Sequence, residues 1–302
     1  DLDDAAFALD LGVDFLALSF VRSANDIAPL RELLANHDNR ARVISKIEKP
    51  EALDDLDAIV AASDGVMIAR GDLGVELPPE IVPLAQERII ERARHFRRPV
   101  IVATQMLESM IQNPRPTRAE VSDVAGAVRS GADAVMLSGE SAAGQHPVKA
   151  VSMMDEIARR TEAYMGDRDN FASLWRAPVS EPPIPVENAI ASTTAELSRQ
   201  LSVRGIVIAS AAEWSTVVMS AGRPSAVVFS TFVEPAASRR ANLLWGVIPV
   251  PVEKRDFADR PELARRIVRA FDPGHQGESV LLVRGFRATA ANSTPSVTVL
   301  SI

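Results

Sequence analysis

The sequence predicts an α/β protein in two parts: a partial (β/α)8 TIM barrel of about five C-terminal βα units, followed by a separate three-layer α/β domain. Three observations support this fold class. Short apolar runs alternate with helical patterns, the runs return at intervals close to the length of one βα unit, and a proline-rich stretch separates two such series.

The first series contains five apolar runs that we expect to be parallel strands. They cover residues 15–18, 43–44, 66–69, 99–103 and 134–137, and helical patterns cover residues 83–96, 118–130 and 147–164. The polar residues at the strand ends are Ser19, Lys46, Asp72, Thr104 and Ser138, which lie 27, 26, 32 and 34 residues apart. One βα unit needs about 30 residues, and in a barrel the chemistry lies at the carboxyl ends of the strands. These side chains are therefore expected at one rim.

Five units do not close an eight-stranded barrel, so we expect the remaining strands upstream of Asp1. The chain opens with DLDDAAFALDLG and without an initiator methionine, which favours this interpretation over the alternative, an open doubly wound sheet. The barrel part is expected to cover residues 1–170.

Prolines mark the end of the first series, because four of them fall within residues 178–185. We expect a linker at residues 171–186 and a C-terminal domain at residues 187–302. The expected helices of that domain cover residues 186–201, 215–221, 234–243 and 260–271, and its expected strands cover residues 205–209, 225–230, 247–250, 279–284 and 296–301.

The composition narrows the classes of function. The chain has 302 residues, a formal net charge of −7, and no apolar stretch near the roughly 18 residues of a membrane helix. It lacks a basic stripe with interleaved aromatic residues, so neither nucleic acid nor a membrane is expected as a partner. The absence of cysteine excludes disulfides and thiolate metal sites.

Two charged residues end the second predicted strand, in the stretch ARVISKIEKPEAL. Alternate side chains of a strand share a face, so Lys46 and Glu48 are expected to point the same way. Taken alone, they are more simply a solvated ion pair. Asp72 follows the next strand directly after Gly71, where a turn is the simple interpretation.

Together, the carboxylates of Glu48 and Asp72 at neighbouring strand ends predict a divalent metal site. Mg²⁺ binds through one or two carboxylates and completes its shell with water and substrate oxygens. Backbone N–H groups beside the glycines could receive a substrate carboxylate or phosphate. Lys46 would then supply a positively charged hydrogen-bond donor to the negative charge that develops on the substrate during the reaction.

The fourth and fifth strands also end in residues that could take part in chemistry. Thr104 presents a hydroxyl, although a helix N-cap is an equally good interpretation of it. Ser138 and Glu140 follow the last strand in MLSGES. The stretch from Gly139 weakly resembles a nucleophile elbow, but its fifth residue is Ala143, so a serine hydrolase is not favoured.

Several long segments resemble the pyruvate kinase family: LGVDFLALSFVRSANDI, ISKIEKPEAL, GVMIARGDLGVELP, VIVATQMLESMIQNPRPTRAEVSDVAGAV and DAVMLSGESAAGQHPVKAV. The resemblance covers residues 1–164 and continues more weakly into the second part. It implies a cytoplasmic, glycolytic enzyme that transfers the phosphoryl group of phosphoenolpyruvate to ADP, giving pyruvate and ATP. It also implies a homotetramer for the complete protein.

The resemblance assigns roles to the residues at the strand ends. Lys46 would lie beside the transferred phosphoryl group and the enolate oxygen, and Glu48 and Asp72 would hold Mg²⁺ or Mn²⁺. The backbone amides of Gly71 and Asp72 would bind the substrate carboxylate, which Thr104 would also contact.

The resemblance also implies that Thr104 takes part in a proton relay. Ser138 and Glu140 would lie around this relay. The resemblance also implies K⁺, whose ligands would lie outside this chain.

The chain departs from the family's pattern in two places. The N-terminal barrel strands and the lid domain are absent, so we expect little or no turnover from these residues alone. In the C-terminal part, the stretch ASAAEWSTVV places Glu213 and Trp214 where a phosphate cradle is expected, so a sugar-bisphosphate activator should not be recognised in the usual way.

Two other functions remain open from the sequence. One is a magnesium-enolate lyase of the pyruvate and phosphoenolpyruvate barrel type, and the other is a non-catalytic, truncated relic. The segment TQMLESM and the C-terminal part argue against the lyase, and intact Lys46, Glu48, Asp72 and Thr104 argue against the relic.

Overall fold

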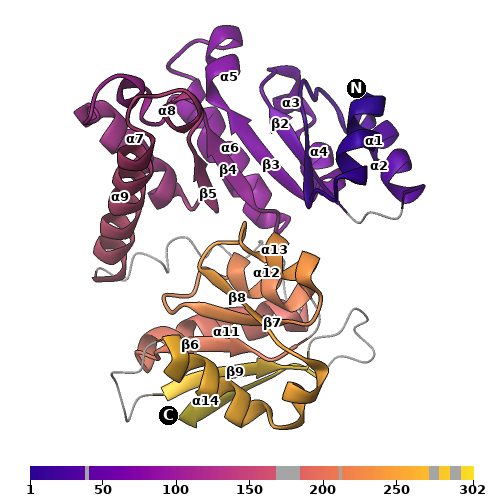
Figure 1. Ribbon diagram of the computed structural model, residues 1–302, viewed down its shortest axis with the longest axis vertical. Coiled ribbons are helices and arrows are strands. Elements are labelled where there is room, and N and C mark those ends of the chain that lie inside the picture. Colours follow the sequence, from indigo (N-terminus) through magenta and orange to yellow (C-terminus); the bar gives the residue numbers. More distant parts are fainter. Residues whose placement is uncertain (38–40, 168–183, 211–212, 272–278, 286–293) are drawn as a thin grey trace. The chain divides into compact units, whose positions relative to one another are not determined.

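The computed structural model describes residues 1–37, 41–167, 184–210, 213–271, 279–285 and 294–302 (Figure 1). The chain divides into two compact units, Asp1–Asp169 and Asn170–Ile302, which are described separately below. Most of the expected linker at residues 171–186 lies outside the described residues.

The first unit is built on a parallel five-stranded sheet whose strand order follows the sequence, β1-β2-β3-β4-β5. Its strands are β1 (Phe15–Leu18), β2 (Arg42–Ile47), β3 (Gly65–Ala69), β4 (Val100–Ala103) and β5 (Ala134–Met136). All four pairings are parallel, and the register places Lys46 opposite Met67 and Ile68 opposite Val102. Each predicted apolar run is a strand, and β2 is longer than its predicted core of two residues.

Helices connect the strands and cover the sheet (Figure 1). They are α1 (Leu2–Asp10), η1 (Ala24–Ile27), α2 (Ala28–Ala35), α3 (Glu51–Asp54), α4 (Leu56–Ala62), α5 (Arg70–Glu76), α6 (Val82–His95), η2 (Glu108–Ile111), α7 (Arg118–Ser130), α8 (Gly139–Ala142) and α9 (Pro147–Asp167). The ends of α7 are set by local sequence. Thr117 and Glu120 form a capping box at its start, and Gly131 ends it with a left-handed φ of 89°.

The central strands of this sheet are buried on both faces. Every residue of β3 and of β4 is buried, which explains why these strands read as continuous apolar runs rather than as an alternating pattern. Residues of these strands, such as Val66, Ile68 and Val102, pack in one hydrophobic core with Ile89 and Ile90 of α6.

Asp64 ties the amino ends of β2 and β3 together. Its carboxylate accepts hydrogen bonds from Arg31 Nη1 at 2.6 Å and from the backbone N–H of Val43 at 2.9 Å, and Arg42 lies 3.4 Å away. Burial raises the pKa of Asp64. The hydrogen bonds from Arg31 and Val43 and the charges of Arg31 and Arg42 lower this pKa by more than burial raises it, so the pKa lies below its ordinary value.

Replacing Asp64 with Asn should make the stability of this unit less dependent on pH. Because the folded pKa is depressed, the carboxylate stabilises the protein above its unfolded pKa of about 3.9, and this contribution is lost as the pH falls through the folded pKa. Calorimetry at pH 7 should therefore show a lower Tm for Asp64→Asn, with a smaller difference below pH 4. Asp57→Asn is the control, since Asp57 pairs with Arg92 but is 59% exposed. An equal loss of Tm at both pH values would contradict the assignment.

The second unit contains a mixed five-stranded sheet in the order β10-β9-β6-β7-β8. Its strands are β6 (Gly205–Ile208), β7 (Val228–Phe232), β8 (Val247–Pro251), β9 (Ser279–Arg284) and β10 (Ser296–Ser301). Its helices are α11 (Val186–Gln200), α12 (Glu213–Ala221), α13 (Pro235–Ala241), η3 (Lys254–Ala258) and α14 (Arg260–Phe271). Among the strands described here, β10 alone pairs antiparallel, with β9.

Two hydrophobic cores, one on each face of this sheet, give the unit three layers. Ile206 and Ile208 of β6 pack in a core with Val218 of α12, whereas the alternate residue Val207 packs in a second core with Leu263 of α14. The predicted fold class, a parallel βα series followed by a separate α/β unit, agrees with both sheets.

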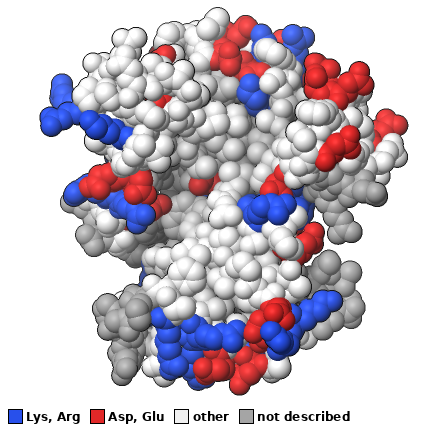
Figure 2. Space-filling model, viewed as in Figure 1, with Lys and Arg blue, Asp and Glu red and all other residues white. Residues whose placement is uncertain are grey.

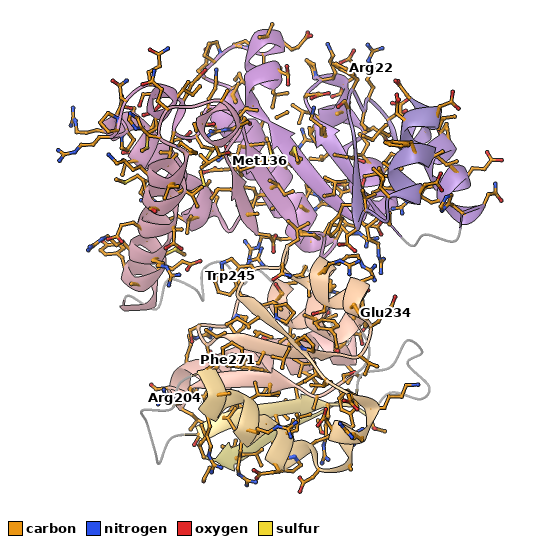
Figure 3. The ribbon with its side chains drawn as sticks, in the orientation of Figure 1. Arg22, Met136, Arg204, Glu234, Trp245 and Phe271 are labelled. Atoms are coloured by element: carbon orange, nitrogen blue, oxygen red, sulfur yellow. The ribbon has the colours of Figure 1, made fainter. Side chains whose placement is uncertain are left out.

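One predicted strand of this unit was placed too early. Residues 225–230 were expected, but β7 begins at Val228, where pairing with Ile206 starts. Arg223 precedes it with a left-handed φ of 45°, and its guanidinium stacks on Trp245 at 5.4 Å (Trp245 is labelled in Figure 3). The chain therefore turns before it can enter the sheet.

Basic and acidic side chains lie close to one another over the face shown in Figure 2. Among the described residues, no helix is both long enough and apolar enough to cross a membrane.

Candidate active site

Lys46 and Glu48 meet at the carboxyl end of β2. The ammonium nitrogen Nζ of Lys46 lies 3.0 Å from Oε2 of Glu48 and donates a hydrogen bond to Ser19 Oγ at 3.1 Å. Ser19 directly follows β1, so the ends of two neighbouring strands meet at this ammonium group. The two charged side chains therefore share a face, as the strand pattern predicts.

Glu48 is an almost fully buried carboxylate, with 1% of its surface exposed. Its Oε1 accepts a 2.5 Å hydrogen bond from the backbone N–H of Phe20. Its Oε2 is also buried; it forms the ion pair with Lys46 and accepts no hydrogen bond from a third group within the described part of the chain. A solvated surface pair would have both oxygens in water, so the simple ion-pair interpretation does not describe Glu48.

Phe20 is held in an unusual conformation to make that contact. Its φ of 58° lies in the left-handed region, which costs a residue with a side chain about 1–2 kcal/mol, and the residue is 64% exposed. Arg22, two residues after Phe20, lies at the same end of the first unit as α5 (Figures 1 and 3). Sequence reasoning missed Phe20, because no residue pattern signals a left-handed aromatic residue.

Asp72 lies in the first turn of α5, directly after β3, and is exposed. The turn expected from the sequence at Gly71 and Asp72 is therefore the start of a short helix in the structure. In the described residues no group of three or more His, Asp or Glu side chains could hold a metal ion. Among the described residues, the predicted metal ligands are thus the two carboxylates of Glu48 and Asp72 alone, without a third clustered ligand. Two carboxylates suit Mg²⁺ or Mn²⁺, and Oε2 of Glu48, which is buried and pairs with Lys46 without accepting a hydrogen bond from a third group in the described chain, fits such an ion.

Thr104 follows β4 and connects it to the end of β3. Its Oγ1 accepts a hydrogen bond from the backbone N–H of Gly71 at 2.8 Å and donates one to the carbonyl of Ala103 at 2.7 Å. Thr104 has a left-handed φ of 68°, and the next helix, η2, has Leu107 as its N-cap. Thr104 is therefore not a helix N-cap.

Glu140 is buried in α8, beyond the end of β5, with 2% of its surface exposed. Its Oε1 accepts the backbone N–H of Leu107 at 3.1 Å, and its Oε2 accepts the backbone N–H of Ser138 at 2.8 Å. Glu140 thereby joins the segment after β4 to the segment after β5. Met136, the last residue of β5, is labelled in Figure 3. Both oxygens of Glu140 are engaged by backbone groups.

These contacts join three pairs of neighbouring strand ends. Lys46 joins the ends of β2 and β1 through Ser19, Thr104 joins the ends of β4 and β3 through Gly71, and Glu140 joins the segments after β4 and β5. Arg70, which donates to the backbone carbonyl of Thr104, was not singled out from the sequence, because its contacts come from distant parts of the chain.

The first unit has the parallel βα construction of a barrel protein, with charged and polar side chains at the carboxyl ends of its strands, and a separate three-layer α/β unit follows it. These features define the class as barrel proteins that carry an additional α/β domain.

The chain belongs to the pyruvate kinase family. Residues 1–151 match the family model for the pyruvate kinase barrel domain, and residues 188–300 match the model for the pyruvate kinase alpha/beta domain. Together these matches cover most of the chain.

Individual relatives agree with this assignment. A pyruvate kinase of Agrobacterium vitis is 40% identical over 303 residues, which cover 100% of this chain and 61% of the relative. One from Bacillus licheniformis is 40% identical over 288 residues, 94% of this chain and 48% of the relative. One from Geobacillus stearothermophilus is 45% identical over 248 residues, 82% of this chain and 42% of the relative. The chain thus spans about half the length of these relatives.

Proposed function

We propose that this chain is part of a pyruvate kinase that transfers the phosphoryl group of phosphoenolpyruvate to ADP, giving pyruvate and ATP. The observation that carries the proposal is the Lys46 ammonium group 3.0 Å from Oε2 of the buried Glu48 carboxylate, an oxygen that accepts no hydrogen bond from a third group in the described chain. Family membership supports the same reaction, because the relatives are named for it.

A divalent ion, Mg²⁺ or Mn²⁺, would be held by Glu48 and Asp72. Such an ion, when bound, neutralises the charge that develops on phosphate and enolate oxygens. Glu48 is positioned for this role by the backbone N–H of Phe20, which occupies Oε1, so that Oε2, now paired with Lys46, is the oxygen that would turn to the ion. A K⁺ requirement is also proposed, with its ligands outside this chain.

Lys46 stabilises charge during the transfer. An oxygen of the ADP β-phosphate attacks phosphorus, the bond between phosphorus and the enol oxygen breaks, and the electron pair stays on that oxygen as an enolate. The Lys46 ammonium group donates toward this oxyanion, and Ser19 orients the ammonium group through the 3.1 Å hydrogen bond.

The enolate then takes a proton at its terminal carbon and becomes pyruvate. The proposed binding site for the substrate carboxylate comprises the backbone N–H groups of Gly71 and Asp72 and the hydroxyl of Thr104. The Gly71 N–H now donates to Thr104 Oγ1, so a bound carboxylate would replace Oγ1 as its acceptor. The released hydroxyl would be able to join the proton relay, near Ser138 and Glu140.

Phosphoenolpyruvate, ADP and ATP are the proposed small-molecule partners. A homotetramer of the complete protein and a cytoplasmic location are part of the same proposal.

The direct test is a coupled assay of the complete polypeptide that carries these residues. We expect pyruvate to form from phosphoenolpyruvate only when ADP and a divalent ion are both present. Pyruvate-forming or pyruvate-cleaving activity that does not need ADP would instead favour the enolate lyase.

The 302-residue polypeptide alone should show little or no turnover. Its barrel sheet has five strands, whereas eight close a barrel, so β1 and β5 each have one strand neighbour in the described chain. The same coupled assay measures this, with the complete polypeptide as the reference. A steady-state rate within tenfold of that reference would contradict the prediction.

A sugar-bisphosphate activator should not bind through the start of α12. Ser215 and Thr216 are fully buried, Thr216 Oγ1 bonds Ser230 Oγ at 2.5 Å, and the Glu213 carboxylate lies 3.1 Å from Arg240. A buried hydroxyl cannot reach a phosphate, and Glu213 brings a negative charge. Calorimetric titration of the complete protein with fructose bisphosphate should show no saturable binding that depends on Ser215 and Thr216. Binding that is lost in a Ser215→Ala, Thr216→Val variant would refute this.

A further inference from the structure

Arg70 is a buried arginine that contacts several segments near the candidate site. It is the first residue of α5, directly after β3, and only 9% of its surface is exposed. Its Nη2 donates to the backbone carbonyl of Thr104 at 2.7 Å and to Sδ of Met106 at 2.8 Å. Its Nη1 donates to Asp123 of α7 at 2.6 Å and lies 3.4 Å from Gln86 of α6.

The segment that Arg70 contacts is strained. Thr104 and Gln105 have φ values of 68° and 53°, a conformation that costs non-glycine residues about 1–3 kcal/mol each. Such a conformation persists only where surrounding contacts fix it. The hydrogen bond from Arg70 to the carbonyl of Thr104 is a charge-assisted contact to the strained residue itself.

A second buried charge holds the other end of the same segment. Glu140 accepts the backbone N–H of Leu107, so residues 104–107 are bonded to a buried cation at one end and a buried anion at the other. Neither charge lies on the segment itself. The arrangement sets the position of Thr104 Oγ1, which accepts the backbone N–H of Gly71, the neighbour of Arg70.

We propose that Arg70 is a positioning residue that acts through Thr104. By holding the Thr104 carbonyl from the end of β3, it fixes the hydroxyl against Gly71, where the substrate carboxylate and the proton relay are proposed. This inference rests on the proposed function. It predicts that Arg70 matters more for the protonation of the enolate than for phosphoryl transfer, because Arg70 bonds Thr104 directly, whereas Lys46 and Glu48 lie at the end of another strand, β2.

The test uses the complete protein with Arg70→Lys, Thr104→Ala and the double variant. Exchange of the methyl protons of pyruvate with D₂O, followed by NMR, reports the protonation step separately from phosphoryl transfer. A misplacement of about 1 Å costs about 100-fold in rate, so Arg70→Lys should slow this exchange by about 100-fold. In the double variant, Arg70→Lys should slow the exchange little beyond Thr104→Ala alone, because the effects of substitutions at residues that act as one unit do not add.

Arg31→Lys is the matched control, since Arg31 bonds Asp64 and the backbone carbonyl of Ala62 but lies at the amino ends of the strands. It should lower Tm as Arg70→Lys does and leave methyl-proton exchange unchanged. If Arg70→Lys does not fold, Asp123→Asn, at a carboxylate that is 37% exposed, should give about a 10-fold loss in the same direction. Equal effects of Arg70→Lys and Arg31→Lys, or effects that multiply in the double variant, would overturn the proposal.

A measurement that needs no activity separates this proposal from the proposed function. The Gly71 amide should be protected from hydrogen exchange in the wild type and lose that protection in Arg70→Lys. Unchanged protection would overturn the positioning role. A wild-type protein with a protected Gly71 amide but no pyruvate formation would instead overturn the proposed function.

Discussion

Replacing Lys46 with methionine should lower kcat for pyruvate formation by about 10²- to 10³-fold, the loss typical when one donor to a developing oxyanion is removed. Methionine keeps the length and apolar stem of the side chain and removes only its charge and donors. The reason is the position of Nζ, which lies 3.0 Å from Oε2 of Glu48 and donates a hydrogen bond to Ser19. Steady-state kinetics of the complete protein, with phosphoenolpyruvate and ADP saturating, measure the effect.

Lys49→Met is the control for this prediction. Lys49 lies three residues further along, pairs with Glu76 at 2.5 Å and lies 5.9 Å from the Phe20 ring centroid, so it is a nearby lysine that does not contact Glu48 in the described contacts. Its replacement should change kcat less than about threefold, because the pair is partly exposed and does not reach Glu48. Equal losses for Lys46→Met and Lys49→Met would show that general positive charge, rather than the Lys46 donor, supports the reaction.

Replacing Glu48 with glutamine should weaken Mn²⁺ binding by at least about 100-fold. Loss of an outer-shell partner costs about 10- to 100-fold in metal affinity, and Glu48 is proposed to contact the ion directly. Glutamine preserves the side-chain volume and can still accept the Phe20 N–H at its amide oxygen. Electron paramagnetic resonance titration of the complete protein with Mn²⁺ measures free and bound ion directly.

Two further variants make this prediction specific. Asp72→Asn should show a loss of Mn²⁺ affinity of the same order, since both carboxylates are proposed ligands. Glu76→Gln, on the same short helix as Asp72 and paired with Lys49, should leave the affinity unchanged. Wild-type affinity in Glu48→Gln would exclude Glu48 as a ligand.

Much of the fold follows from local sequence. The bounds of β1, α7, α14, β9 and β10 match the predicted ranges. Their ends coincide with strong signals, such as the capping box at Thr117 and the left-handed Gly131 that closes α7. The contact between Lys46 and Glu48 also follows from local pattern, because a two-residue spacing at a strand end places both side chains on one face.

The remaining features depend on tertiary contacts that local sequence does not encode. The burial of Glu48 depends on the backbone N–H of Phe20, 28 residues away, and on the left-handed φ of Phe20. Arg70 bonds residues 34 and 53 positions further along the chain. A strained backbone and a buried guanidinium both require a completed environment, so neither is visible as a periodic pattern.

The most direct test of the account is a crystal structure of the complete protein with Mn²⁺ and phosphoenolpyruvate, in which anomalous scattering locates the ion. The account predicts one Mn²⁺ peak within about 2.2 Å of carboxylate oxygens of both Glu48 and Asp72, with the Lys46 ammonium group at the phosphoryl oxygens. A peak that touches only one of these carboxylates or neither, or a Lys46 side chain turned away from the substrate, would contradict it.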